Sequence, residues 1–142
     1  MSIRLPYYDL SPEALAGLRA VGSYLEKSSI GRDLLELVYL RVSQINGCAF
    51  CLKKHSKSLR ENGVSQEKLD TLAGWHASAF FSNKERSALG WAESLTAINT
   101  THAPDDQFHL LQEHFSEKEM SDLTFAIANM NALNRLAISM RQ

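Results

Sequence analysis

The chain has 142 residues, of which 44% are apolar and 22% charged, and its formal charge at neutral pH is −1. These values predict one globular domain, residues 1–142, and without a basic stripe they exclude a nucleic-acid-binding surface as a main feature. No apolar run is long enough to span a bilayer, and the first residues lack a signal-peptide core. We therefore expect a cytoplasmic protein without nucleic-acid or membrane partners.

Helix signals recur along the chain and no alternating strand pattern is found, so the sequence predicts an all-α fold. The first expected helix begins at Pro12, after an N-capping Ser11, and the next three cover 34–44, about Cys48 to Glu61, and Ser65 through Leu72. A further helix begins at Ser82, and another segment contains Phe108, Leu110 and Leu111. The last expected helix runs from Ser116 to about Met140. Breaks are expected at Ser29–Asp33, at 46–47 and at Asn99–Pro104. Glu85 and Glu119 complete predicted capping boxes with Ser82 and Ser116.

The last predicted helix is apolar on more than one side, and Trp75, Phe80 and Phe81 cluster near an expected loop. This surplus of apolar surface favours self-association, although a buried central helix explains the pattern of the last helix equally well. Light scattering that found only monomer would exclude self-association.

The only two cysteines, Cys48 and Cys51, stand three positions apart, and His55 follows four residues later. If a helix begins near Cys48, the three side chains lie at i, i+3 and i+7 along one face. Free backbone N–H groups and the helix dipole in the first turn favour a thiolate, and the imidazole lies one turn from Cys51. In a reducing compartment such a pair is more typical of catalysis or metal binding than of a structural disulfide.

Glu36 stands in an apolar stretch twelve residues before Cys48. In one continuous helix it would lie roughly 18 Å away, but a turn at Asn46-Gly47 should fold the two helices into an antiparallel pair. Glu36 then reaches the level of His55, where it would fix the tautomer of the imidazole and raise its basicity. The alternative is a surface ion pair with Arg32, four residues earlier.

Zinc binding is the main chemical alternative for these residues. Cys48, Cys51 and His55 could supply three ligands and Glu36 a fourth, but the chain lacks the further cysteines of a typical zinc site. A redox sensor that forms the disulfide without turnover is a third possibility. We therefore treat a catalytic thiol pair as the leading hypothesis.

A glutamate, eleven residues and then Cys-x-x-Cys-x-x-x-His resembles the AhpD-like alkylhydroperoxidases of the carboxymuconolactone decarboxylase superfamily. The segments 41–47 and 131–136 also resemble that branch. The resemblance implies an all-helical bundle assembled as trimers or hexamers, with the cysteine pair on a helix hairpin. It also implies reduction of hydroperoxides through a cycling disulfide, with no other cofactor and with electrons from a dithiol protein, a lipoyl group or a thioredoxin-like reductant protein.

Carried over from the family, Cys51 attacks the peroxide, Cys48 resolves the sulfenic acid, and His55 and Glu36 form a proton relay. The helix dipole and an expected greater exposure would instead favour Cys48 as the nucleophile. Some peroxidase members place a second relay histidine where this chain has Phe50, so the relay here is shorter. Decarboxylases of the superfamily lack the cysteine pair, which disfavours the lactone reaction.

Overall fold

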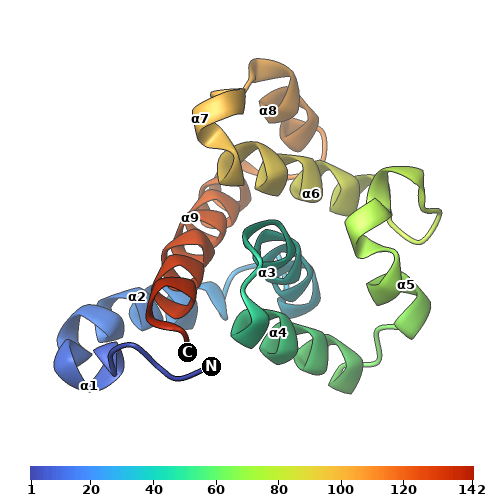
Figure 1. Cartoon of the computed structure of the whole chain (residues 1–142). Helices are drawn as coiled ribbons and strands as arrows, with labels where there is room; N and C mark the ends of the chain where they lie inside the picture. The colour runs from blue at the N-terminus through green and yellow to red at the C-terminus, as the bar shows by residue number, and fades with distance from the viewer.

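Ten helical elements and no strand make up the computed structural model, which describes residues 1–142 (Figure 1). In order they are α1 (Tyr7–Leu10), α2 (Pro12–Leu25), α3 (Arg32–Asn46), α4 (Ala49–Glu61), α5 (Gln66–Asp70), the 3-10 helix η1 (Leu72–Ala77), α6 (Asn83–Thr96), α7 (Ile98–Thr101), α8 (Asp105–Gln112) and α9 (Glu117–Met140). The predicted all-α class is confirmed.

Helix α3 lies at the centre, packed against α4, α6 and α9 (Figure 1). Two apolar clusters surround it. The larger one joins α3, α6 and α9 through residues that include Val38, Val42, Ala88, Ala92, Leu123 and Ile127. The smaller one joins α3 and α4 to α5, η1 and α6 through Leu37, Leu40, Leu59, Leu69, Leu72, Trp75, Phe81 and Leu89. Helix α3, which contributes to both clusters, is also the helix that carries Glu36.

Several predicted boundaries are confirmed and others need correction. Both capping boxes are formed, at Ser82–Glu85 and at Ser116–Glu119. Ser11 precedes α2 as predicted, but its side chain makes no capping hydrogen bond. Helix α3 begins at Arg32, inside the expected break, and the helix expected through Leu72 ends at Asp70 before η1 begins.

The four-residue helices α1 and α7 are not among the predicted elements. Helix α7 occupies part of the break expected at Asn99–Pro104, and the chain then turns at His102 and Ala103, which both have positive φ. Elements this short carry no apolar periodicity of their own, so the sequence pattern does not distinguish them from loops.

The aromatic cluster expected at the surface is mostly buried. Trp75 and Phe81 belong to the smaller apolar cluster, and only Phe80 is exposed. Nine residues of helix α9 are buried, while Phe125 and Ile138 remain exposed on it. Because Trp75 and Phe81 are buried, they no longer support self-association, which stays a prediction.

The two ends of the chain are joined to each other. The backbone N–H of Arg4 donates to the carbonyl oxygen of Met140 at 2.9 Å, and the hydroxyl of Tyr7 donates to the side chain of Gln142. Figure 1 shows both termini on the same side of the molecule as the start of α4. None of the helices combines the length and the apolar character needed to cross a membrane.

A carboxylate on α6 ties three elements together. Glu93 accepts hydrogen bonds from Arg41 of α3 at 3.0 Å, and from Trp75 and His76 of η1 at 2.8 and 3.1 Å. Burial alone would raise the pKa of Glu93, but these hydrogen bonds and the nearby guanidinium outweigh it and lower the pKa below its usual value. The charged form is therefore favoured by folding.

Replacing Glu93 with glutamine is expected to lower the free energy of unfolding at pH 7 by about 2 kcal/mol, because the guanidinium of Arg41 loses its charged acceptor. The pKa of Glu93 is lower in the folded chain than the unfolded value of 4.5, so its contribution is full above that pH and disappears as the pH falls through the folded value. Urea unfolding at pH 7 and at about pH 3 measures this. A variant as acid-sensitive as the wild type would contradict the prediction.

Candidate active site

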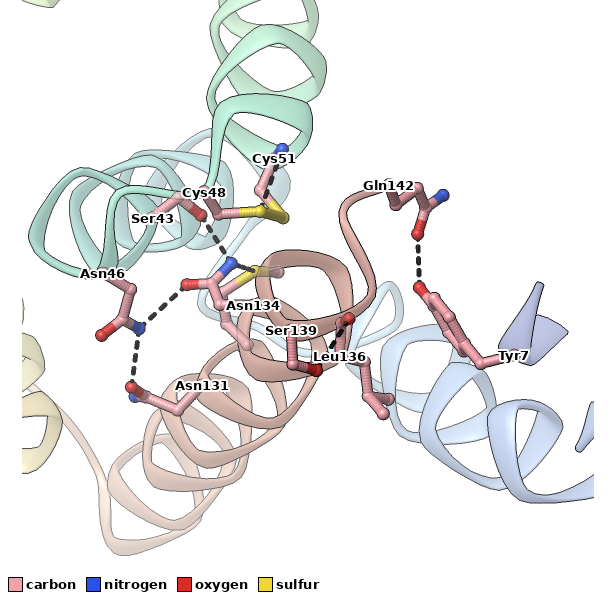
Figure 2. The surroundings of a disulfide bond; sticks show 11 residues. Tyr7, Ser43, Asn46, Cys48, Cys51, Asn131, Asn134, Leu136, Ser139 and Gln142 are labelled. Atoms are coloured by element: carbon pink, nitrogen blue, oxygen red, sulfur yellow. Dashed lines mark hydrogen bonds between the residues drawn. A yellow bond between two sulfur atoms is a disulfide. The ribbon is translucent and has the colours of Figure 1, made fainter. Parts of the chain in front are cut away.

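The two cysteines begin helix α4. Cys48 is the residue immediately before the helix, and its sulfur accepts a hydrogen bond from the backbone N–H of Cys51 at 3.4 Å. The two side chains form a disulfide, with their Cα atoms 5.3 Å apart. Figure 2 shows this disulfide between the first turn of α4 and the C-terminal part of α9. The two sulfurs therefore meet in the first helical turn, which is where the sequence places them.

The turn before Cys48 is formed by a glycine in the left-handed region. Gly47 ends α3 with φ of 72°, and its N–H donates to the carbonyl oxygen of Ser43 at 2.9 Å. A residue with a side chain is strained at this φ, so glycine allows the sharp reversal between α3 and α4. This reversal brings the two helices side by side.

Both cysteines are buried within the chain. Cys48 is 1% exposed and Cys51 is 5% exposed, and the two form a small apolar cluster with Ala137 of α9. The expectation that Cys48 is the more exposed of the two is therefore wrong, because α9 covers the start of α4. Exposure does not favour Cys48 as the reactive sulfur.

The expected contact between Glu36 and His55 is present. The imidazole Nδ1 lies 2.7 Å from Oε2 of Glu36, and both side chains are largely buried. A carboxylate can only accept a hydrogen bond, so Nδ1 carries a proton and the unprotonated nitrogen of a neutral His55 is Nε2. The alternative ion pair of Glu36 with Arg32 is absent, because the Arg32 guanidinium lies near Ser58 instead, at 3.4 Å.

Tyr39 packs against His55 from the same helix that carries Glu36. The ring centroids lie 5.3 Å apart, with the planes tilted by 49°. Burial and the negative charges of Glu36 and Glu26 raise the pKa of Tyr39 to about 12, so its hydroxyl stays protonated at neutral pH. Tyr39 is not among the predicted site residues, although it stands three positions after Glu36, on the same side of the helix.

A second polar group lies beside the disulfide. The side chains of Asn131 and Asn134 on α9 meet Asn46 and Ser43 at the end of α3 (Figure 2). From the sequence, the two α9 asparagines are recognised only as part of a family-like segment. Two amides three residues apart within a long apolar helix are a signal in themselves, because buried amides need hydrogen-bond partners.

The remaining predicted features of the site concern metal binding and the relay. The sulfurs are joined in the disulfide, and no group of three or more His, Cys, Asp or Glu side chains is arranged to hold a metal ion. Phe50, at the position of a second relay histidine in some peroxidases, is 44% exposed and offers no ionisable group. The acid–base pair that α3 and α4 bring together is Glu36 with His55.

Comparison with known proteins adds three findings. The sequence profile of the carboxymuconolactone decarboxylase family matches residues 12–94 of this chain. The uncharacterised protein YdfG of Bacillus subtilis is 36% identical over 140 residues, which are 99% of this chain and 95% of that protein. The crystal structure of an Agrobacterium tumefaciens protein of unknown function, provisionally assigned to antioxidant defence as an AhpD protein, matches with a TM-score of 0.95 and 38% identity, covering 99% of this chain and 97% of that one.

The similarity to a named reductase is more local. The alkyl hydroperoxide reductase AhpD of Nocardia farcinica is 44% identical over 52 residues, which are 37% of this chain and only 28% of that protein. The full-length relatives therefore show the family and the fold, and the named activity comes from a relative matched over a short stretch.

Proposed function

The chain belongs to the carboxymuconolactone decarboxylase family, in its AhpD-like branch, and on this basis we propose that it is a peroxidase that reduces hydroperoxides through a Cys48–Cys51 disulfide cycle. One observation carries the proposal. A cysteine pair able to close a disulfide stands on the helix that carries a histidine one turn further on, and Nδ1 of that histidine is bound to a largely buried carboxylate. These groups provide a nucleophile, a base and a resolving thiol.

The cycle begins with the reduced pair. His55, with Nδ1 held by Glu36, accepts the thiol proton of Cys51 directly or through a water molecule. The Cys51 thiolate attacks the terminal oxygen of the hydroperoxide, so that a sulfur–oxygen bond forms and the oxygen–oxygen bond breaks. The alkoxide takes the proton from His55 and leaves as an alcohol, and Cys51 remains as a sulfenic acid.

Resolution uses the second cysteine. The sulfur of Cys48 attacks the sulfenic sulfur of Cys51, the disulfide forms, the sulfur–oxygen bond breaks, and hydroxide leaves as water with the thiol proton. An external dithiol, on a protein or a lipoyl group, then returns two electrons and two protons by thiol–disulfide exchange. No other cofactor is required, and assembly as a trimer or hexamer is part of the proposal.

Turnover of an organic hydroperoxide with dihydrolipoamide as the dithiol donor tests this function. We expect multiple turnovers, with one alcohol formed for each dithiol oxidised. A protein that forms the disulfide stoichiometrically but does not turn over would instead be a redox sensor. Stoichiometric zinc in anaerobically purified, reduced protein would favour the metal-binding alternative.

A further inference from the structure

Four polar side chains form a buried hydrogen-bond network at the contact between α9 and the end of α3. Nδ2 of Asn46 donates to Oδ1 of Asn131 at 2.9 Å and to Oδ1 of Asn134 at 3.0 Å, and Nδ2 of Asn134 donates to Oγ of Ser43 at 3.1 Å (Figure 2). Ser43 and Asn134 are fully buried and Asn131 is 5% exposed. We call these four residues the amide clamp.

The amide clamp is connected to the turn that carries Cys48. The carbonyl oxygen of Ser43 accepts the N–H groups of both Gly47 and Cys48, at 2.9 and 3.1 Å. Ser43 and Asn46 thus stand on the chain immediately before Cys48, and both are bound to α9. The backbone of Cys48 is held through them, whereas the hydrogen bond of its sulfur is with the N–H of Cys51 and not with the clamp.

The hydrogen bonds of the amide clamp do not involve the cysteine sulfurs, so they can persist when the disulfide is reduced. Every hydrogen bond of the clamp joins amide, hydroxyl or backbone groups, apart from a 3.5 Å contact between Asn134 and the thioether of Met130. Opening the disulfide therefore removes none of these bonds. Asn131 is further held by Thr96 and by the carbonyl of Ile127, at 3.2 and 3.0 Å.

We propose that Asn46, Asn131 and Asn134 are positioning residues that keep the thiol of Cys48 within reach of Cys51 while the pair is reduced. Ring closure forms one sulfur–sulfur bond and transfers two electrons and two protons to the oxidant. Less conformational freedom is lost in that step if the turn is already fixed, so closure is faster and the disulfide is harder to reduce. The role in catalysis rests on the proposed function, whereas the effect on the disulfide equilibrium does not.

A purely structural network would stabilise the fold without changing the disulfide equilibrium. The chain offers a matched control for this distinction. Asn129 lies on the same helix, and its side chain donates to the carbonyl oxygen of Leu18 in α2 at 3.1 Å, away from the cysteine turn. Its loss should weaken the packing of α9 but leave the freedom of Cys48 unchanged.

The test is the equilibrium of the full chain with reduced and oxidised dithiothreitol, read by alkylation of free thiols and mass spectrometry. Asn46→Ala and Asn134→Ser are expected to lower the ring-closure constant about tenfold, which raises the reduction potential by about 30 mV. Asn129→Ala is expected to keep the wild-type potential. Urea unfolding of the oxidised proteins establishes that the variants compared are folded, and Asn46, which is only partly buried, provides the test if Asn134→Ser does not fold.

Clamp variants with the wild-type potential would overturn the proposal, as would an Asn129→Ala shift equal to theirs. Neither result depends on peroxide, so failure of the clamp is distinguishable from failure of the proposed peroxidase. In the peroxidase itself, a sulfenic acid trap added with one equivalent of hydroperoxide should capture about ten times more Cys51 adduct in Asn46→Ala than in the wild type.

Discussion

Replacing Cys51 with serine is expected to lower hydroperoxide turnover by at least about 10³-fold, because the attacking sulfur is lost. The Cys48→Ser variant should differ in kind. It should consume one equivalent of hydroperoxide at close to the wild-type rate and then stop at a sulfenic acid on Cys51, since no internal thiol can resolve it. Rapid-mixing kinetics and mass spectrometry of dimedone-labelled peptides measure both outcomes.

The surroundings of the two sulfurs are the basis on which we propose unequal roles for them. Cys51 is one helical turn before His55 and is slightly more exposed than Cys48, which α9 covers. Cys48 has a competing advantage, since its sulfur accepts the N–H of Cys51 at the start of α4, a contact that favours a thiolate. We expect a base one turn away on the same helix to contribute more to deprotonation during attack than one long hydrogen bond, and we therefore propose that Cys51 attacks.

The outcome that contradicts this assignment is specific. If Cys51→Ser forms a sulfenic acid on Cys48 at the wild-type rate while Cys48→Ser is unreactive, the contact at the start of the helix dominates and the roles are reversed. If neither variant reacts with the first equivalent of hydroperoxide, the two cysteines act only as an intact dithiol. Matching far-ultraviolet circular dichroism of the two variants is the control for folding.

The part of the site that lies within one helix could be predicted from the sequence. The spacing of Cys48, Cys51 and His55 fixes a common face once α4 begins beside Cys48, and Gly47 marks the turn that brings Glu36 to His55. These inferences need only local geometry. Glu36 and His55 are 19 positions apart in the sequence and lie on different helices, but the short turn between these helices leaves few possible arrangements.

The features that could not be predicted depend on the packing of distant helices. The burial of Cys48 involves α9, whose Ala137 belongs to the same apolar cluster as the two cysteines, so an argument from α4 alone overestimates the exposure of Cys48. Asn134 meets Ser43 across 91 positions of sequence. Trp75 is expected near a loop as part of a surplus of apolar surface, whereas it is buried and its indole N–H donates to Glu93 on α6.

Replacing His55 with alanine is expected to lower kcat/KM for the hydroperoxide by about 10²- to 10⁴-fold, the range typical of a lost general base. Glu36→Gln should have a smaller effect, about 10- to 100-fold, because the imidazole remains but loses the carboxylate that orients it. The introduced glutamine could also present its amide N–H to Nδ1 and so stabilise the wrong tautomer. Steady-state kinetics against hydroperoxide concentration, repeated from about pH 5 to about pH 9, measures both variants.

A nearby carboxylate provides the matched control for Glu36. Glu26 is exposed and acts on the same region through its charge on Tyr39, but it makes no contact with His55. If the relay depends on the 2.7 Å contact and not on local negative charge, Glu26→Gln keeps the wild-type rate and pH profile while Glu36→Gln does not. Equal effects of the two substitutions would mean that Glu36 acts only through its negative charge and not through its contact with His55. A His55→Ala variant with wild-type activity would remove the relay from the mechanism and leave the start of α4 as the only source of thiolate activation.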